Sequence, residues 1–211
     1  MRKAFLATGV IVGLMTGSVV GGGQYSRSAY AKSIPVRPDS RLWLEGGSNV
    51  RDWTCKATAM EARIELEDKM PAGETGQVSA VRGAFVKVPV RKLKCGDRHM
   101  EAHMYAALKA PSPSVESFII AQLEWLPVSD STSRTIEVTG FLSIAGVNRP
   151  IRMTVVGDRL SDGTLRARGA LPILMTDYGV TPPRPWGGIL RTANKVVIQF
   201  EIFVDPSLKT T

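Results

Sequence analysis

The chain has only two histidines, His99 and His103, and they are four residues apart. On a helix this spacing puts both imidazoles on one face, which is the geometry of two metal ligands. The zinc-protease pattern needs a glutamate directly after the first histidine, whereas Glu101 comes two residues after it. A third ligand would have to be a carboxylate such as Asp97. The alternative is a polar helix face turned to solvent, and we predict this alternative and no metal site.

Nucleophilic chemistry has no better support. The sequence contains no Gly-x-Ser-x-Gly motif and no glycine-rich phosphate loop after a predicted strand. The only cysteines, Cys55 and Cys95, would have only the two histidines as bases. Carboxylates are spread over outward-facing strand positions. We therefore assign no catalytic residue and expect a binding protein rather than an enzyme.

The two cysteines suggest a structural role instead. In an exported protein an even pair favours one disulfide, here Cys55–Cys95, and the alternative is two free buried thiols. A bridge across a loop of this size is worth roughly 3–4 kcal/mol on the chain-entropy model. Neither cysteine belongs to a Cys-x-x-Cys motif or a zinc-type cluster, so redox catalysis and structural metal are both weakly supported.

The first residues predict export. Arg2 and Lys3 precede an uncharged run over residues 4–23, and Ala29-Tyr30-Ala31 then place small residues at the positions that a signal peptidase reads. A positive start, an apolar middle and a small-residue cleavage site are the three parts of a secretory signal peptide.

The alternative is a retained membrane anchor, but the strongly apolar part of this segment is shorter than the ~20 residues that span a bilayer. We expect cleavage before Lys32. Residues 1–31 would then be the signal peptide, and residues 32–211 a single domain in the periplasm or outside the cell.

Charge excludes one class of partner. The chain carries a net charge of +8, which falls to +5 without residues 1–31. The densest basic cluster, Arg91, Lys92 and Lys94, is small and lacks interleaved aromatic residues, so we expect no nucleic-acid partner. An ordinary basic surface explains the charge, with transient attraction to anionic lipid headgroups as the alternative. The sequence leaves the oligomeric state open, a dimer included.

The elements that must position these residues are mainly strands. From residue 40 onward, apolar and polar side chains alternate with a period of two, which is typical of half-buried strands. The alternation predicts strands around residues 41–45, 49–57, 62–67, 85–91, 117–125, 135–144, 151–155, 164–170 and 195–202. Asp162-Gly163 and the Ala145–Asn148 segment predict short hairpin turns.

Three segments break this alternation. Residues 32–39, with two prolines, are predicted to be an extended leader, and residues 172–188 a long loop with room for a short helix. Residues 97–109 predict one amphipathic helix on the sheet, capped by Asp97. Its stripe of Met100, Met104 and Leu108 is predicted to pack in the core rather than bind a cofactor.

Eight or nine antiparallel strands with one helix favour a closed barrel or a sandwich. A barrel of eight strands can hold one small ligand. Inward apolar side chains fill a small barrel as well as they line a pocket, so the pattern alone does not predict a cavity.

The order of several motifs resembles one family, the YceI-like polyisoprenoid-binding proteins of bacterial envelopes. Residues 42–53 (LWLEGGSNVRDW) are similar to the family's strand, turn and strand, with Gly47 in place of the usual Thr and Arg51 in place of the usual His. Residues 140–151 (GFLSIAGVNRPI) match its Gly-x-Leu-x-Ile-x-Gly-x-x-Lys/Arg-Pro run. The segments 88–95, 106–110, 117–120 and 196–204 also fit.

This resemblance implies an all-β fold with one or two short helices. The expected architecture is an extended, lipocalin-like, eight-stranded antiparallel barrel with an apolar interior for a long isoprenoid or other lipid tail. It implies no catalysis, and no cofactor apart from a bound isoprenoid or isoprenoid quinone as ligand. Some members are linked to quinone chemistry, and others to acid or osmotic stress.

The leading hypothesis is therefore an envelope protein that carries or sequesters a lipid tail. The alternatives are an envelope enzyme that acts on a lipid or quinone through His99 or His103, and a structural or partner-binding domain without a cavity. On the Ser117–Trp125 strand the pattern does not decide which face points inward. The residues predicted to line the barrel are Leu42, Leu44, Ile64, Leu66, Val86, Val88, Met104, Ile136, Val138, Leu142, Met153, Val155, Trp186, Ile198 and Phe200.

Overall fold

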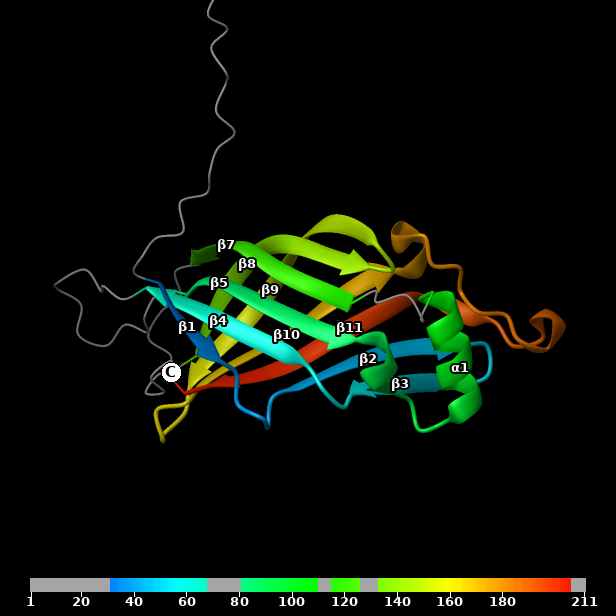
Figure 1. The fold of residues 1–211 in the computed structure, drawn as a ribbon, viewed down its shortest axis with the longest axis horizontal. Coiled ribbons are helices and arrows are strands. Elements are labelled where there is room, and N and C mark those ends of the chain that lie inside the picture. Colours follow the sequence, from blue (N-terminus) through cyan, green and yellow to red (C-terminus); the bar gives the residue numbers. More distant parts are fainter. Residues whose placement is uncertain (1–30, 68–80, 110–114, 126–132, 206–211) are drawn as a thin grey trace, which may run out of the picture.

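The structure, a computed structural model, describes residues 31–67, 81–109, 115–125 and 133–205. These residues form one antiparallel sheet with one α-helix and three short 3-10 helices (Figure 1). The segment expected to be a signal peptide lies outside the described residues, apart from Ala31 at the start of the first strand. No helix of the described part is long and apolar enough to cross a membrane.

The strands follow the predicted alternation, and every neighbouring pair is antiparallel. Their hydrogen-bonded order is β1-β4-β5-β7-β8-β9-β10-β11-β2-β3-β6. The strands are β1 (Ala31–Pro35), β2 (Arg41–Ser48), β3 (Asp52–Ala57), β4 (Glu61–Glu67), β5 (Val81–Pro89), β6 (Leu93–Lys94), β7 (Val115–Trp125), β8 (Ser133–Ile144), β9 (Val147–Arg159), β10 (Leu165–Leu174) and β11 (Thr192–Val204).

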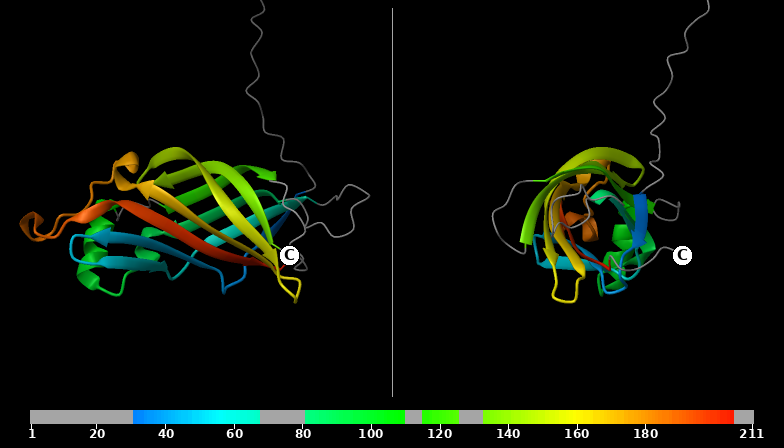
Figure 2. Two further views of the ribbon diagram at one scale, coloured as in Figure 1. Left: turned by 180° about the vertical axis from the view of Figure 1, so that it is seen from behind. Right: turned by 90° about the vertical axis from the view of Figure 1, so that its left-hand side faces the viewer.

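The sheet curls into an elongated, barrel-like shape, seen end-on in Figure 2. The expected closed barrel of eight strands is wrong in two respects. Eleven strands are present in the described residues, and among these no pairing between β1 and β6 closes the sheet. Proline has no N–H group to donate to a neighbouring strand, and a proline ends two of the strands. Pro35 ends β1, and Pro89 ends β5 before the 3-10 helix η1 (Val90–Lys92).

The broken strands nevertheless continue one another around the curl. β2 pairs with β3, and the preceding β1 pairs with the following β4, in almost the same register. Likewise β4 pairs with β5, and β3 pairs with β6. β1 with β2, β3 with β4, and β5 with β6 therefore act as three long strands around the interior, and each of these three is bent at one point.

The predicted leader is a paired strand instead. Ile34 lies in β1 opposite Ile64 of β4 and is fully buried, in a cluster with Ile202 and Val204 of β11. Burial of one isoleucine is worth ~1.5–3 kcal/mol, which explains why this segment packs against the barrel rather than lying free of it.

Two predicted turns are confirmed. Ala145 and Gly146 join β8 to β9 with φ angles of 50° and 85°, which a tight type I′ hairpin requires at both central positions. Gly163 joins β9 to β10 with φ 86°, and the carboxylate of Asp162 accepts a hydrogen bond from the Thr164 N–H at 2.9 Å.

The predicted loop over residues 172–188 begins later than expected, because β10 runs on to Leu174. Pro172 is tolerated there since the pairing of β10 with β9 ends at Gly169, which leaves that edge unpaired beyond it. The remaining loop contains the 3-10 helices η2 (Met175–Tyr178) and η3 (Trp186–Gly188).

The core is divided along the barrel. One buried cluster packs the loop against the sheet, and the smaller cluster around Ile34 lies near the end of β11. The larger cluster consists of Val138, Leu142, Met153, Val155, Leu171, Tyr178 and Val180.

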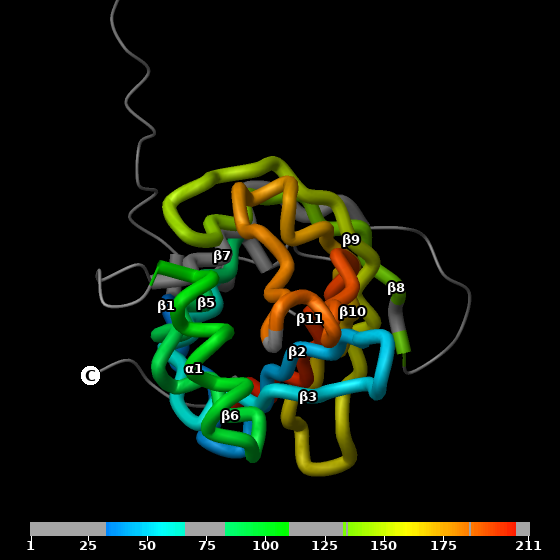
Figure 3. The backbone as a smooth tube through the Cα atoms, turned by 90° about the vertical axis from the view of Figure 1, so that its right-hand side faces the viewer, coloured from blue at the N-terminus to red at the C-terminus, as the bar shows by residue number. Residues whose placement is uncertain are grey.

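One end of the barrel carries the helix α1 (Arg98–Ala107), as Figures 1 and 3 show. Asp97 caps it as predicted, because its carboxylate accepts hydrogen bonds from the N–H groups of His99 and Met100. The β2–β3 turn and the loop after β10 lie at the same end of the molecule as α1 in Figure 3. We call this the helix end, and the end with the β9–β10 turn the hairpin end.

Candidate functional site: an apolar cavity along the barrel

A cavity of about 710 Å³ lies inside the curled sheet. This volume falls within the ~300–1,000 Å³ typical of ligand pockets. Thr192 and Val204, the first and last residues of β11, both border it, so the cavity follows a strand path of ~40 Å at ~3.3 Å per residue. The interior therefore holds a long space bordered by side chains of the buried clusters.

The predicted inward residues are placed as expected wherever their side chains are described. Thirteen of the fifteen border the cavity: Leu42, Leu44, Ile64, Val86, Val88, Met104, Ile136, Val138, Leu142, Met153, Val155, Ile198 and Phe200. The side chains of Leu66 and Trp186 lie outside the described part of the structure. So do those of β7, and the inward face of Ser117–Trp125 therefore stays open. That these residues bind a ligand remains a prediction.

One wall of the cavity was not predicted. Leu165, Ala167, Leu171 and Ile173 alternate along β10 and all border the cavity. The period-two signal was present in the sequence, but its middle positions are alanine and glycine, which carry little hydrophobic weight.

The small residues of β10 make room for an aromatic ring. Gly169 lies opposite Phe200 of β11, and a Cβ atom at Gly169 would come within 2.5 Å of the Phe200 ring. Gly46 and Trp53 repeat this arrangement between β2 and β3, where a Cβ at Gly46 would lie 2.2 Å from the indole. A ring that covers a cross-strand glycine replaces the missing side chain and keeps the wall closed.

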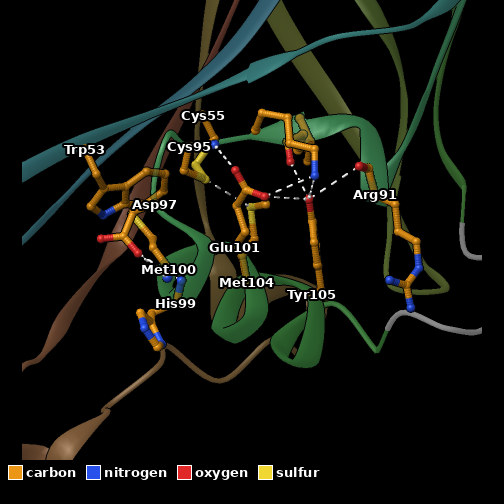
Figure 4. The surroundings of a disulfide bond; sticks show 12 residues. Trp53, Cys55, Arg91, Cys95, Asp97, His99, Met100, Glu101, Met104 and Tyr105 are labelled. Atoms are coloured by element: carbon orange, nitrogen blue, oxygen red, sulfur yellow. Dashed lines mark hydrogen bonds and ion pairs between the residues drawn. A yellow bond between two sulfur atoms is a disulfide. The ribbon is translucent and has the colours of Figure 1, made fainter.

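The predicted disulfide is present between Cys55 and Cys95. It joins β3 to the segment just before α1, as Figure 4 shows. Cys55 is fully buried and borders the cavity, and the Met104 sulfur lies 4.0 Å from the Cys95 sulfur. The disulfide therefore ties the helix to the cavity wall.

A polar network also fastens the helix to the segment that carries Cys95. The Glu101 carboxylate accepts hydrogen bonds from the Cys95 N–H and the Lys94 ammonium, both at 3.0 Å, and the Tyr105 hydroxyl donates to the Leu93 carbonyl at 2.8 Å (Figure 4). Lys94 and the Cys95 N–H lower the pKa of Glu101. Tyr105 and Glu101 raise the pKa of Lys94, so both groups are charged at neutral pH.

The helix stripe packs in the core only in part, because Leu108 lies against the larger buried cluster. Met100, Met104 and Leu108 border the cavity and are only half-buried, and no residue of α1 is fully buried. The reason is that α1 lies at the helix end, where its stripe faces the cavity.

Polar side chains gather at the helix end of the cavity. His99 and His103 are exposed and border it, and the Asp97 carboxylate lies 3.5 Å from the Arg51 guanidinium. Hydrogen bonds from the Met100 and His99 N–H groups lower the pKa of Asp97, and Arg51 adds to the effect. The described residues contain no group of three or more histidine, cysteine or acidic side chains that could hold a metal.

The arrangement suits one kind of ligand. Along its length the cavity offers almost only aliphatic and aromatic side chains, and charged groups border it near its ends, as Arg51 and Arg159 do. An extended apolar chain could lie along β11, with a polar group at the helix end.

The sequence matches the family model described as YceI-like domain over residues 45–204. A search of curated proteins found no match. Among solved structures, BcnA of Burkholderia cenocepacia is similar at 19% identity and a TM-score of 0.61, over 81% of this chain and 99% of that one.

Two further structures share the fold. A polyisoprenoid binding domain from Saccharophagus degradans has 15% identity and a TM-score of 0.60, over 83% of this chain and 99% of its own. The YceI protein of Campylobacter jejuni has 14% identity and a TM-score of 0.52, over 92% of this chain and 94% of its own.

Proposed function

The chain belongs to the YceI-like domain family, and we propose that it binds a long apolar tail of the polyisoprenoid or isoprenoid-quinone class inside its barrel. The observation that carries the proposal is the cavity of about 710 Å³ that runs from Thr192 to Val204 between inward apolar side chains. The solved domain from Saccharophagus degradans, which has this fold, is described as polyisoprenoid binding, and this supports the same ligand class.

The physical driving force is burial of hydrocarbon. Each methylene group removed from water contributes ~0.8 kcal/mol before the costs of immobilising the chain. A tail that lies along β11 contacts side chains from several strands at once, so affinity depends mainly on its length. Arg51, His99 and His103 at the helix end give a headgroup polar neighbours without making it the main source of affinity.

The same proposal gives the protein a role without catalysis, namely carriage or sequestration of the tail in the cell envelope, with a stress response as one setting. Residues 1–31 would be removed on export, and residues 32–211 would act as a single domain. The Cys55–Cys95 disulfide supports an oxidising compartment such as the periplasm. A carrier of this kind must also meet a membrane surface, at least transiently.

Intact-mass analysis of the protein purified from its own host tests the proposal directly. Under native conditions we expect a species whose extra mass is released by organic extraction as a prenyl lipid or quinone. Under denaturing conditions we expect the mass of residues 32–211 with no free thiol. A chain that carries no extractable lipid, and that takes none up when mixed with prenyl lipids, would count against the proposed ligand.

A further inference from the structure

The helix end carries two exposed aliphatic side chains on neighbouring loops. Val50 in the β2–β3 turn is 69% exposed, and Ile189 after η3 is 76% exposed. Asn49 ties the two loops together: its side-chain amide donates to the Ile189 carbonyl at 3.0 Å and accepts from the Arg191 N–H at 2.8 Å. Two aliphatic tips are thus held side by side in water, where neither gains from burial.

Basic side chains lie on the loop that carries Ile189 and at the start of α1. Arg184 and Arg191 lie exposed on the loop that carries Ile189, and Arg98 lies exposed at the start of α1. None of these three forms an ion pair within the described residues.

These tips stand next to the cavity. Pro183 and Pro185 of the same loop border it, as does Ser48 just before the β2–β3 turn. A ligand that leaves the cavity here would therefore emerge between the aliphatic tips and the unpaired arginines.

We propose that the helix end docks on an anionic phospholipid surface, with Val50 and Ile189 inserted at the boundary between headgroups and acyl chains and Arg98, Arg184 and Arg191 against the phosphates. This inference rests on the proposed function, because docking there lets a tail pass between bilayer and cavity without crossing water. Aliphatic tips beside unpaired arginines match the two attractions, apolar and electrostatic, that hold proteins at membrane interfaces. An acidic protein surface would match the arginines but not the projecting tips.

The test measures binding to vesicles of phosphatidylcholine with and without phosphatidylglycerol. The variants are Ile189→Ser and Arg184→Gln, neither of which borders the cavity, together with their double variant. Phe141→Ser removes an exposed aromatic ring from the outer wall of β8, and Arg152→Gln removes an exposed charge from the outer wall of β9. Neither residue borders the cavity, so these two serve as matched controls.

We expect the wild type to bind the anionic vesicles and to bind neutral vesicles far more weakly. Arg184→Gln should lower the partition coefficient about fivefold, as expected for one cation near an anionic membrane. Ile189→Ser should lower it about tenfold through lost apolar insertion. Each control should bind within about twofold of wild type, which is well below either predicted loss.

Three results would overturn the docking surface: no binding of wild type to anionic vesicles, undiminished binding by the double variant, or equal loss in the controls. A second arm adds a prenyl chain from ethanol without vesicles. If the double variant takes up this chain like wild type but no longer binds vesicles, docking and tail binding are both supported. If vesicles bind and the chain does not, the docking surface stands and the proposed ligand falls.

Discussion

Single side chains at the helix end contribute to the stability of the fold. Asp97 caps α1 through the N–H groups of His99 and Met100 and also faces Arg51. Aspartate and asparagine cap helices about equally well, and alanine caps poorly. Asp97→Ala should therefore lower the melting temperature, whereas Asp97→Asn should keep most of it at neutral pH.

The charge of Asp97 adds a pH dependence whose sign follows from its lowered pKa. A carboxyl whose pKa is lower in the folded chain stabilises the fold above its unfolded pKa of about 3.9, and this contribution is lost as the pH falls through the folded value. Melting curves recorded between about pH 5 and pH 2 should show a shallower fall for Asp97→Asn than for wild type. Identical slopes would show that ionisation of the Asp97 carboxylate does not stabilise the fold, since Glu101 titrates in both proteins.

Another residue-scale prediction separates tail binding from chemistry at the histidines. Leu142 is buried and borders the cavity, whereas His99 and His103 are exposed at its end. Leu142→Gln places an amide without partners in the apolar wall, at a cost of ~1–3 kcal/mol, which weakens prenyl binding roughly tenfold to hundredfold. His99→Ala and His103→Ala should bind nearly as wild type.

Val86→Thr, at a half-buried wall position, gives a second and gentler polar change should Leu142→Gln fold poorly. Titration of all four variants with a prenyl lipid decides between tail binding in the cavity and chemistry at the histidines. Loss of binding in the histidine variants alone would instead favour an enzyme that works on a lipid or quinone at the helix end.

At the scale of elements, the disulfide is the strongest fastening of α1. Cys55 and Cys95 are 40 residues apart, so on the chain-entropy model their bond contributes roughly 3–4 kcal/mol to the free energy of unfolding. Urea unfolding of the double variant Cys55→Ala, Cys95→Ala should show this loss. Reductant should destabilise wild type and leave the double variant unchanged, and equal stability of wild type in both conditions would refute the role.

Alternation of side chains predicted most strands, because burial of one face is decided locally along each strand. Elements whose state depends on distant partners were harder to predict. Ile34 directly precedes Pro35, and only its contacts with Ile202 and Val204 show that β1 belongs to the barrel. Pro172 suggested the start of a loop. β10 nevertheless continues through it, because the pairing of β10 with β9 has already ended at Gly169.

The same limit applied to the site. Inward positions with large side chains were predicted, and every one whose side chain is described borders the cavity. The β10 wall was missed because Ala167 and Gly169 carry little signal, although the lack of a side chain at Gly169 is what admits the Phe200 ring. Small residues are informative only when the residue across the strand pair is known.

At the scale of the whole molecule, the sequence could not decide between a filled and a hollow interior. The same inward aliphatic side chains serve either, and the outcome depends on how far the sheet curls and what closes its ends. Here α1 lies along one side of the helix end, and the loop through Tyr178 and Val180 packs against the sheet. The described residues thus enclose a long space that no local pattern predicts.

The central claim is that this space holds an apolar tail, and its most direct test is a titration with prenyl chains that share one headgroup and differ in length. Each added five-carbon unit should tighten binding at least tenfold, given ~0.8 kcal/mol per buried methylene before ordering costs, until the cavity is full and the affinity levels off. Affinity that does not change with chain length, or that follows the headgroup alone, would contradict the account.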